Sequence, residues 1–314
     1  MRRRLEPMTI DAQANLRTLR DVLRYAVTRF NEKTIYFGHG QVDAFDEASF
    51  LVLRTLSLPL ERMDVFLDAF LTHAEIHTLI ELIERRVKKR LPAAYLVGEA
   101  WLQGYRFNVD GRVIVPRSFI AELLKEELAP WLADPGAVES VLDLCTGSGC
   151  LAIIAADVFP NARVHAVDIS VDALAVAARN VQDYDLDERV RLIESDLFDA
   201  VAAERYDLIL CNPPYVTDAA LSKLPREYTH EPTLALAGGT DGLDVVRRVV
   251  SAAKRHLTAD GLLVVEVGDG RAAVEREYPR TPLSWATTSG GDDMVFLARA
   301  ADLPVQSVVR PAAA

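Results

Sequence analysis

From about residue 118 onward, short apolar runs rich in β-branched residues alternate with segments of helical periodicity. The apolar runs predict strands at Val138–Cys145, Arg163–Ile169, Val190–Ser195, Tyr206–Cys211 and Gly261–Gly268. The periodic segments predict helices at Leu151–Val158, Val171–Gln182 and Leu243–Leu257. Leu283–Thr288 and Met294–Ala298 predict a final antiparallel pair. Because such alternation favours a parallel sheet covered on both faces, we expect an α/β domain over residues 118–300.

The N-terminal part of the chain follows a different pattern, in which apolar residues recur at helical spacing. The spacing predicts helices at Leu16–Phe30, Asp46–Leu56 and Thr72–Arg90. Thr72 and the glutamate three residues later form a capping-box pattern, and Pro92 stops the third helix. We therefore expect a small helical domain over residues 1–98.

Residues 101–115 are mostly aromatic or β-branched, which predicts a β-hairpin with Asp110-Gly111 as its turn. We expect this hairpin, within residues 99–117, to link the helical domain to the α/β domain. The last residues, 301–314, are expected to form a flexible tail.

The composition excludes several other classes of protein. The 314 residues are 50% apolar, and 35 Lys and Arg against 46 Asp and Glu give a net charge of −11. These values are typical of globular proteins and exclude disordered, collagen-like and disulfide-rich chains. Three cysteines, no signal peptide and no apolar run of roughly 18 residues predict a cytoplasmic protein that does not enter membranes. The acidic balance disfavours non-specific binding of nucleic acid.

A turn with two glycines follows the first predicted strand of the α/β domain. Gly147 and Gly149 let the backbone approach a ligand closely, at a strand end where open α/β sheets bind ligands. The segment Asp143–Cys150 lacks the third glycine of the dinucleotide fingerprint and the Lys-Ser/Thr of a phosphate-binding loop. A pyrophosphate site is therefore not expected, and the alternative is a plain turn into a helix.

Acidic residues end the next two strands. Asp168 is placed to accept hydrogen bonds from ribose hydroxyls, because Ser170 already fits the N-cap of the next helix. Asp196 can receive an adenine amino group, although alone it also fits a solvated loop. With Asp143, these carboxylates favour a nucleoside with a cationic sulfonium tail over a phosphorylated one.

The most specific pattern is Asn212-Pro213-Pro214-Tyr215, directly after a buried strand. The two prolines stiffen the turn and leave it rich in carbonyl acceptors. The Asn212 side chain and a turn carbonyl can both face one planar NH₂ group, and Tyr215 can stack on it. The pattern indicates a site for a carboxamide or a conjugated amino group; the alternative is a tight structural turn.

Other patterns have simpler explanations. His73 and His77 are spaced like some zinc ligands, but no third ligand is evident and no metal site is expected. Cys145 and Cys150 fit apolar packing. His39, between two glycines, fits either substrate contact or a turn with positive φ. The basic run Glu84–Arg90 fits a solvated helix end or a nucleic-acid patch.

Together these residues resemble the class I S-adenosylmethionine-dependent methyltransferases, and within them the protein N5-glutamine methyltransferases. The resemblance also includes Ala94–Leu96, Gly98–Ala100, Val115–Arg117, Glu227–Pro232 and Gly238–Leu243. It implies a seven-stranded Rossmann-like domain that binds S-adenosylmethionine, with a helical domain that recognises a protein substrate. The implied cofactor residues are Asp143, Cys145, Thr146, Gly147, Ser148, Gly149, Asp168, Asp196, Leu197 and Asn212. The implied catalytic residues are Asn212, Pro213, Pro214 and Tyr215, and the implied substrate-binding residues are Pro116, Arg117 and Tyr215.

Two short stretches favour one branch of this family. The release-factor branch typically reads Pro-Arg-Pro-Glu-Thr-Glu after the hairpin, whereas this chain reads Pro116–Glu122 as PRSFIAE. With Tyr36–Gly40 and Asp46–Ala48, this resembles the branch that methylates the third protein of the large ribosomal subunit, although that branch is expected to have proline at Phe119. Ribosomal RNA in assembly precursors is a further possible partner. The alternatives are release factors, adenine-amino methylation of nucleic acid, and an assembly factor without transferase activity.

Overall fold

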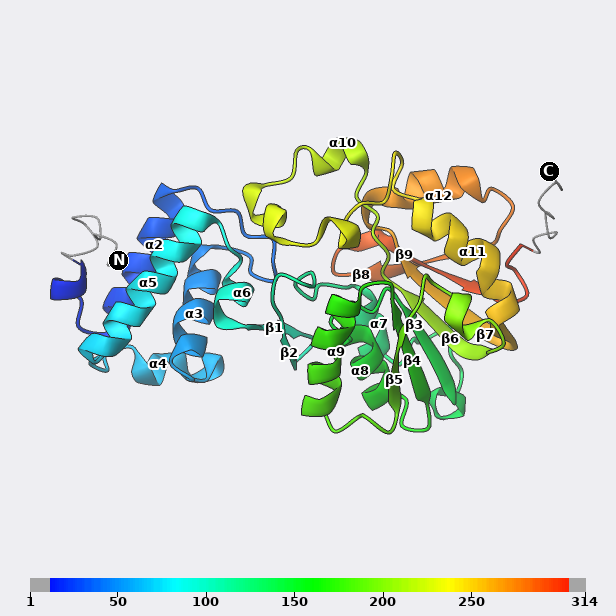
Figure 1. Cartoon of the computed structure of the whole chain (residues 1–314), viewed down its shortest axis with the longest axis horizontal. Coiled ribbons are helices and arrows are strands. Elements are labelled where there is room, and N and C mark those ends of the chain that lie inside the picture. Colours follow the sequence, from blue (N-terminus) through cyan, green and yellow to red (C-terminus); the bar gives the residue numbers. More distant parts are fainter. Residues whose placement is uncertain (1–11, 305–314) are drawn as a thin grey trace. The chain divides into compact units, whose positions relative to one another are not determined.

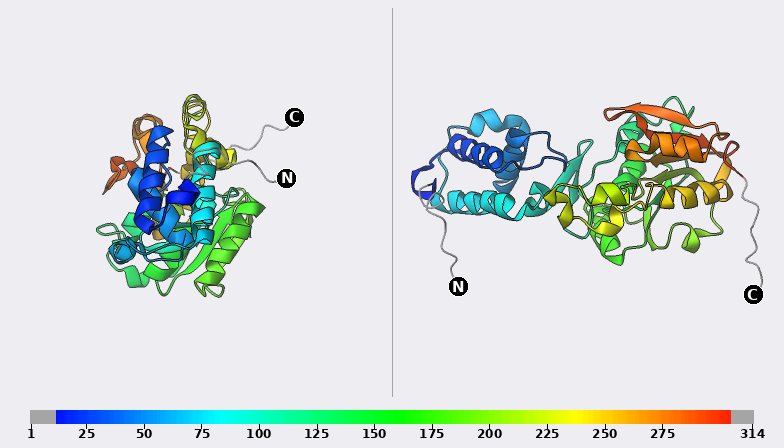
Figure 2. Two further views of the ribbon diagram at one scale, coloured as in Figure 1. Left: turned by 90° about the vertical axis from the view of Figure 1, so that its left-hand side faces the viewer. Right: turned by 90° about the horizontal axis from the view of Figure 1, so that it is seen from above.

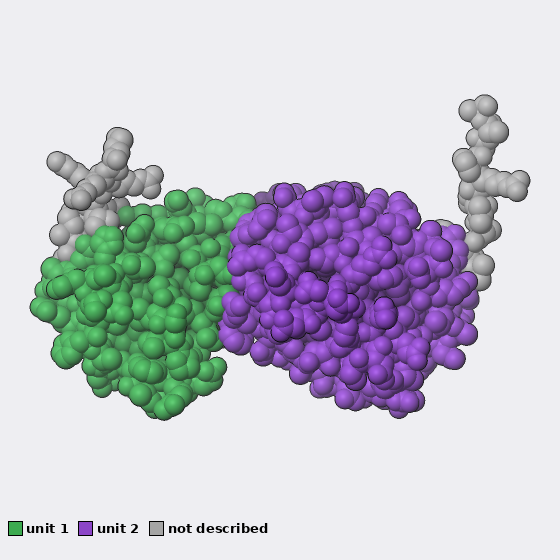
Figure 3. Space-filling view, turned by 60° about the horizontal axis from the view of Figure 1, so that its bottom comes forward, with its two compact units in different colours: residues 1–100, 225–230 green, residues 101–224, 231–314 purple. Residues whose placement is uncertain are grey.

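The computed structural model describes residues 12–304, which divide into two compact units. Unit 1 comprises the chain up to Ala100 together with the inserted segment Pro225–His230, and unit 2 comprises the rest (Figure 3). The inserted segment lies within the stretch that the sequence assigns to the α/β domain. Its place in unit 1 is therefore a feature that the pattern of strands and helices does not predict.

Unit 1 is built from three main helices, α2 (Leu19–Glu32), α3 (Ala44–Thr55) and α5 (His73–Lys89), which pack side by side (Figures 1 and 2). Unit 1 also contains the short elements η1 (Leu60–Arg62), α4 (Met63–Phe66), α6 (Ala93–Val97) and, from the inserted segment, η4 (Arg226–His230). The capping box at Thr72 is present, as predicted. Helix α3 begins earlier than predicted, because the Asp43 carboxylate accepts hydrogen bonds from the amides of Phe45 and Asp46.

A buried ion network fixes the inserted segment within unit 1. The Arg86 side chain is fully buried, with its Nε 2.5 Å from Oε1 of Glu47 and its Nη1 3.5 Å from Oε1 of Glu227. Arg90 donates to the same Glu227 oxygen at 3.2 Å, and the Tyr36 amide donates to it at 3.1 Å. Arg86 and Arg90 of the predicted basic run therefore form ion pairs within unit 1, so they are not part of a nucleic-acid patch.

The linking hairpin is present, but its predicted turn is wrong. Strands β1 (Glu99–Leu102) and β2 (Tyr105–Asn108) are joined by Gln103 and Gly104, whose φ angles are 49° and 84°. Two positive φ angles are characteristic of the tight hairpin turn. Asp110 instead makes a local turn, where its carboxylate binds the Arg112 amide and guanidinium. The aspartate-glycine pair therefore ends the hairpin segment instead of reversing it.

Unit 2 contains a seven-stranded sheet of order β5-β4-β3-β6-β7-β9-β8 (Figure 1). The strands are β3 (Ser140–Leu144), β4 (Arg163–Asp168), β5 (Val190–Glu194), β6 (Tyr206–Cys211), β7 (Leu257–Glu266), β8 (Ser284–Thr288) and β9 (Gly291–Arg299). The first five in spatial order are parallel, and β9 runs antiparallel to both β7 and β8. The predicted seven-stranded α/β fold, with its final antiparallel pair, is confirmed.

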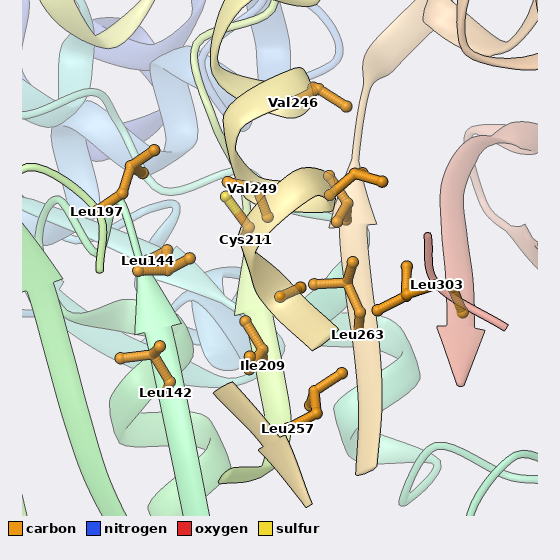
Figure 4. Close-up of a cluster of buried hydrophobic side chains, with 14 of the residues drawn as sticks. Leu142, Leu144, Leu197, Ile209, Cys211, Val246, Val249, Leu257, Leu263 and Leu303 are labelled. Atoms are coloured by element: carbon orange, nitrogen blue, oxygen red, sulfur yellow. The ribbon is translucent and has the colours of Figure 1, made fainter. Parts of the chain in front are cut away.

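Helices cover both faces of this sheet. α7 (Ile120–Lys125), α8 (Cys150–Val158) and α9 (Val171–Asp183) pack in sequence against one another and against β3, β4, β5 and β7. On the other face, Val246 and Val249 of α11 (Asp244–His256) pack with Leu144, Ile209 and Leu263 (Figure 4). The remaining elements of unit 2 are α10 (Asp218–Leu221), α12 (Arg271–Glu277), η2 (Pro135–Ala137), η3 (Asp199–Val201), η5 (Thr233–Ala235) and η6 (Gly268–Gly270).

The predicted tail differs from the structure at its start. Leu303 is 2% exposed and packs in the same apolar cluster as α11, while Lys254 Nζ donates to the carbonyls of Ala301 and Leu303. The rest of the predicted tail, residues 305–314, lies outside the described residues. Within residues 12–304, no helix combines the length and apolarity needed to cross a bilayer.

We expect Arg86→Ala to lower the free energy of unfolding of unit 1 by about 3–5 kcal/mol, because it leaves Glu47 and Glu227 buried without their shared cation. Urea denaturation measures this loss. The control is Arg20→Ala, which breaks an exposed ion pair with Asp68 and is expected to change stability by less than about 1 kcal/mol. Equal losses in the two variants would contradict the structural role of the network.

Candidate active site

A cavity of about 200 Å³ opens at the carboxyl ends of β3, β4, β5 and β6, all within unit 2. Seven of the residues selected from the sequence line it: Cys145, Gly147, Asp168, Asp196, Leu197, Asn212 and Pro214. The other selected residues, Asp143, Thr146, Ser148, Gly149, Pro213, Tyr215, Pro116 and Arg117, do not form its wall. The cavity wall thus combines some of the predicted residues with others that the sequence did not indicate, such as Arg248 and Leu234.

The glycine turn has an unusual backbone. Gly147 and Gly149 have φ angles of 55° and 80°, and Cys145 has a φ of 60°, which is strained for a residue with a Cβ. An added Cβ on Gly149 would lie 3.2 Å from the Cβ of Ala177 in α9, whereas one on Gly147 would meet no atom within 4 Å. Gly149 is therefore required for helix packing, and Gly147 leaves open space for a ligand.

Asp143 holds this turn from behind. Its Oδ2 accepts the Thr146 hydroxyl at 2.5 Å and the Ala152 amide at 3.1 Å, which ties the end of β3 to the start of α8. Its Oδ1 makes no hydrogen bond to any described residue. Burial raises the pKa of the carboxyl to about 7. Asp143 thus positions the glycine turn and does not face the cavity.

Asp168 does face the cavity and is itself held in place. Its Oδ2 accepts the Gly147 amide at 2.8 Å and its Oδ1 accepts the Ser170 amide at 2.9 Å. The predicted N-cap role of Ser170 is confirmed by its hydrogen bond from the Ala173 amide. Burial raises the pKa of Asp168, partly offset by these amide donors. Each oxygen has a fixed direction and retains capacity for a further donor.

Asp196 also lines the cavity and is paired with a residue that the sequence pattern does not reveal. Its Oδ2 is 2.9 Å from Arg248 Nη2 on α11. The hydrogen bond to Asp196 raises the pKa of the Arg248 guanidinium. Arg248 lies on a helix of ordinary amphipathic pattern, so only the tertiary fold brings it to the site.

Apolar surfaces complete the cavity. Ile169 and Leu234 line it and are 52% and 59% exposed, an unusual exposure for large aliphatic side chains. Val113 and Pro232, from segments far apart in the sequence, lie in the same wall. Apolar side chains together with two carboxylates in one cavity suit a nucleoside, whose base is apolar on its faces and whose hydroxyl and amino groups donate hydrogen bonds.

The Asn-Pro-Pro-Tyr turn lies at one end of the cavity. Asn212 and Pro214 line it, whereas Pro213 is buried beside it. The ring of Tyr215 packs on Gly268, where an added Cβ would lie 2.7 Å from its Cε2. The Tyr215 hydroxyl donates to Oε1 of Glu266 at 3.2 Å. The turn therefore presents its asparagine to the cavity and anchors its tyrosine in the protein.

The segment after the hairpin is also anchored. Arg117 donates to both oxygens of the buried Glu231 at 2.6 Å each, and the Val115 amide donates to the same carboxylate at 3.0 Å. The guanidinium selected for substrate binding is thus engaged within unit 2. Phe119 packs on Gly290, where an added Cβ would lie 2.4 Å from its Cζ. This contact explains how an aromatic side chain fits where proline was expected.

The histidines and cysteines for which the sequence predicts no metal site form none in the described part of the chain. His73 and His77 are exposed on α5, and His39 is buried with its ring 4.5 Å from that of Tyr228. The positive φ in that turn belongs to Gly40, so His39 is not selected by backbone conformation. All three cysteines are free. Within residues 12–304, no group of three or more His, Cys, Asp or Glu side chains could hold a metal ion.

Because burial raises the pKa of Asp143 to about 7, its ionisation is disfavoured in the folded state. The folded state then binds more protons than the unfolded chain between about pH 4 and 7, so stability falls as the pH rises through this window, by up to roughly 4 kcal/mol. We expect Asp143→Asn to remove this contribution, so that urea denaturation from pH 5 to pH 8 gives a flatter stability profile than the wild type. Asp68→Asn, at an exposed site, serves as the control, and an unchanged slope for Asp143→Asn would contradict the assignment.

Comparison with known proteins identifies the family. The family model "Methyltransferase small domain" matches residues 121–227. The chain is 56% identical to the ribosomal protein uL3 glutamine methyltransferase of Bordetella pertussis over 90% of this chain and 95% of that protein. The proteins of the same name from Burkholderia pseudomallei and Neisseria meningitidis are 54% and 51% identical, over 92% and 91% of this chain and 96% and 94% of theirs. Because these matches cover nearly the full length of both chains at 51% to 56% identity, the chain belongs to the family of ribosomal protein uL3 glutamine methyltransferases.

Proposed function

We propose that this protein transfers a methyl group from S-adenosylmethionine to the side-chain amide nitrogen of a glutamine in uL3, the third protein of the large ribosomal subunit. The observation that carries the proposal is the position of Asn212 and Pro214 in the wall of the same cavity as Asp168 and Asp196. The names of the relatives support glutamine in uL3 as the target. We place the reaction in the cytoplasm, where such a ribosomal substrate is made.

The residues of the cavity fit the cofactor. Asp168 is oriented to accept the ribose hydroxyls, and Asp196, held by Arg248, is oriented to accept the adenine amino group. Ile169 and Leu234 offer apolar faces to the base, and the open space at Gly147 leaves room for the chain that carries the sulfonium. When bound, the cofactor supplies an electrophilic methyl group. The nearby carboxylates favour its positive charge.

Asn212 supplies the chemistry on the substrate side. An amide nitrogen is a poor nucleophile because its lone pair is delocalised into the carbonyl. Two acceptors, the Asn212 side-chain oxygen and the Pro213 carbonyl, would hold its two N–H groups and fix the face of the nitrogen toward the methyl group. Such positioning can lower a barrier by roughly 7–11 kcal/mol in favourable cases. The same acceptors stabilise the positive charge that develops on nitrogen, and the proton leaves afterwards to water.

We expect Asn212→Ala to reduce kcat for methylation of uL3 by about 100-fold or more, because it removes one of the two acceptors that position the amide. The Kd of S-adenosylmethionine, measured by calorimetry, is expected to stay within about threefold of the wild type. Asn161→Ala, at an exposed position remote from the cavity, is the matched control. A kcat within about threefold of the wild type would remove the amide-holding role of Asn212.

Asp168→Ala is expected to raise the Kd of S-adenosylmethionine by about tenfold or more, because charge-assisted hydrogen bonds to the ribose are lost. Isothermal titration calorimetry measures the change. Asp172→Ala, four residues along the chain in the exposed first turn of α9, provides the control. An unchanged Kd in the Asp168 variant would show that the ribose binds elsewhere.

A labelled-methyl assay tests the function itself. Purified uL3, a release factor and nucleic acid are each incubated with the protein and labelled S-adenosylmethionine. Label on a glutamine of uL3 alone is the expected result. Label on the release factor or on adenine would favour those substrates instead, and the acidic composition already disfavours nucleic acid. Absence of label from every substrate would favour an assembly factor without transferase activity.

A further inference from the structure

The end of β7 carries a buried acid that the proposed mechanism does not use. Glu266 is 1% exposed and lies at the carboxyl end of a central strand of the sheet. An ionised carboxylate in such a place is costly unless several donors surround it. Its position beside the Asn-Pro-Pro-Tyr turn therefore calls for a specific role.

Glu266 collects donors from two separate segments of unit 2. Its Oε2 accepts the Ser118 hydroxyl at 2.6 Å and the Phe119 amide at 2.9 Å. Its Oε1 accepts the Tyr215 hydroxyl at 3.2 Å. A proline at position 119 would lack the amide donor, so this departure from the expected family pattern adds a hydrogen bond to the group. The carboxylate thus joins β7, the segment that follows the hairpin and the Asn-Pro-Pro-Tyr turn.

Tyr215 is enclosed on its other sides by glycines. An added Cβ would lie 2.7 Å from the Tyr215 ring if placed on Gly268, 2.7 Å from its Cα if placed on Gly238, and 2.5 Å from its carbonyl oxygen if placed on Gly242. These contacts confine the ring and backbone of the tyrosine, and the bond to Glu266 fixes the remaining direction of the hydroxyl. One oxygen of Glu266 serves Tyr215 and the other serves the residues before α7.

We propose that Glu266 is a positioning residue that holds Tyr215, and through it the Asn-Pro-Pro-Tyr turn, in the geometry required for methyl transfer. The proposal rests on the proposed function, because it assigns Glu266 to the same site. Glu266 touches neither the cavity nor the reacting atoms, and acts through the hydroxyl of Tyr215. Loss of the carboxylate should therefore slow the chemical step without weakening the binding of S-adenosylmethionine.

Steady-state kinetics on the full-length protein with uL3 test whether kcat falls while the KM for S-adenosylmethionine is unchanged. Glu266→Leu, similar in size but without acceptors, is expected to lower kcat at least tenfold while the KM for S-adenosylmethionine stays within threefold. Glu266→Gln retains an acceptor and a donor, and is expected to restore kcat to within about threefold of the wild type. Glu275→Leu, on the exposed face of α12, is the control and should leave both constants unchanged. An unchanged kcat in a folded Glu266→Leu variant would overturn the proposal.

A double-mutant cycle shows whether Glu266 acts through Tyr215. Tyr215→Phe removes only the hydroxyl and should lower kcat by at least about threefold, with the KM for S-adenosylmethionine unchanged. In the Glu266→Leu background the same change should cost no more than twofold, because the hydrogen bond is already absent. If the kcat of the double variant falls by the product of the two single-variant losses, Glu266 does not act through Tyr215 and the proposal is overturned. If Glu266→Leu does not fold, Tyr215→Phe alone decides, since it removes the same bond, and an unchanged kcat would refute the role.

Hydrogen exchange separates this inference from the proposed function. If the wild-type protein transfers no methyl group to uL3, the proposed function fails while the positioning can still be measured. Tyr215→Phe should then accelerate amide exchange over residues 212–218 relative to the wild type and to Glu275→Leu. Exchange equal to that of the wild type would show that the hydrogen bond to Glu266 does not hold the turn.

Discussion

Buried and half-buried carboxylates at the ends of parallel strands organise the site. Asp143 lies near the end of β3 and accepts a hydrogen bond from the turn that follows its own strand. Asp168 ends β4 and Glu266 ends β7, and each accepts a hydrogen bond from the loop that follows a neighbouring strand. A desolvated carboxylate is costly without donors, so each one fixes the loop that supplies them. Asp143 fixes the start of α8, Asp168 fixes the glycine turn, and Glu266 fixes Tyr215. The cavity is the space that remains between these loops.

The same principle extends to unit 1. Glu227, in the segment inserted from the second half of the chain, is buried against Arg86 and Arg90. The next residue after that segment, Glu231, binds Arg117 in unit 2, and Pro232 lines the cavity. Two buried acids four residues apart in the sequence thus belong to different units.

Much of the fold could be predicted from the sequence, because periodicity and strand-end residues are local signals. The alternation of strands and helices, the capping box at Thr72 and the antiparallel end of the sheet all follow from such signals. The position of the hairpin turn could not be predicted, because Asp110-Gly111 and Gln103-Gly104 both fit a two-residue turn. Only the pairing of strands β1 and β2 decides between them. Arg248 and Glu266 were missed since their roles depend on tertiary neighbours. For the same reason, the local sequence does not indicate that Arg117 pairs with Glu231 instead of facing a substrate.

The proposed function depends on Asn212 holding a carboxamide beside the cavity proposed to bind the methyl donor. A crystal structure of the protein with S-adenosylhomocysteine and uL3 tests it most directly. We expect the adenosyl group to lie against Asp168 and Asp196, with a glutamine amide nitrogen of uL3 within hydrogen-bond distance of the Asn212 side chain. A glutamine bound away from Asn212, or an adenosyl group outside the cavity, would contradict it.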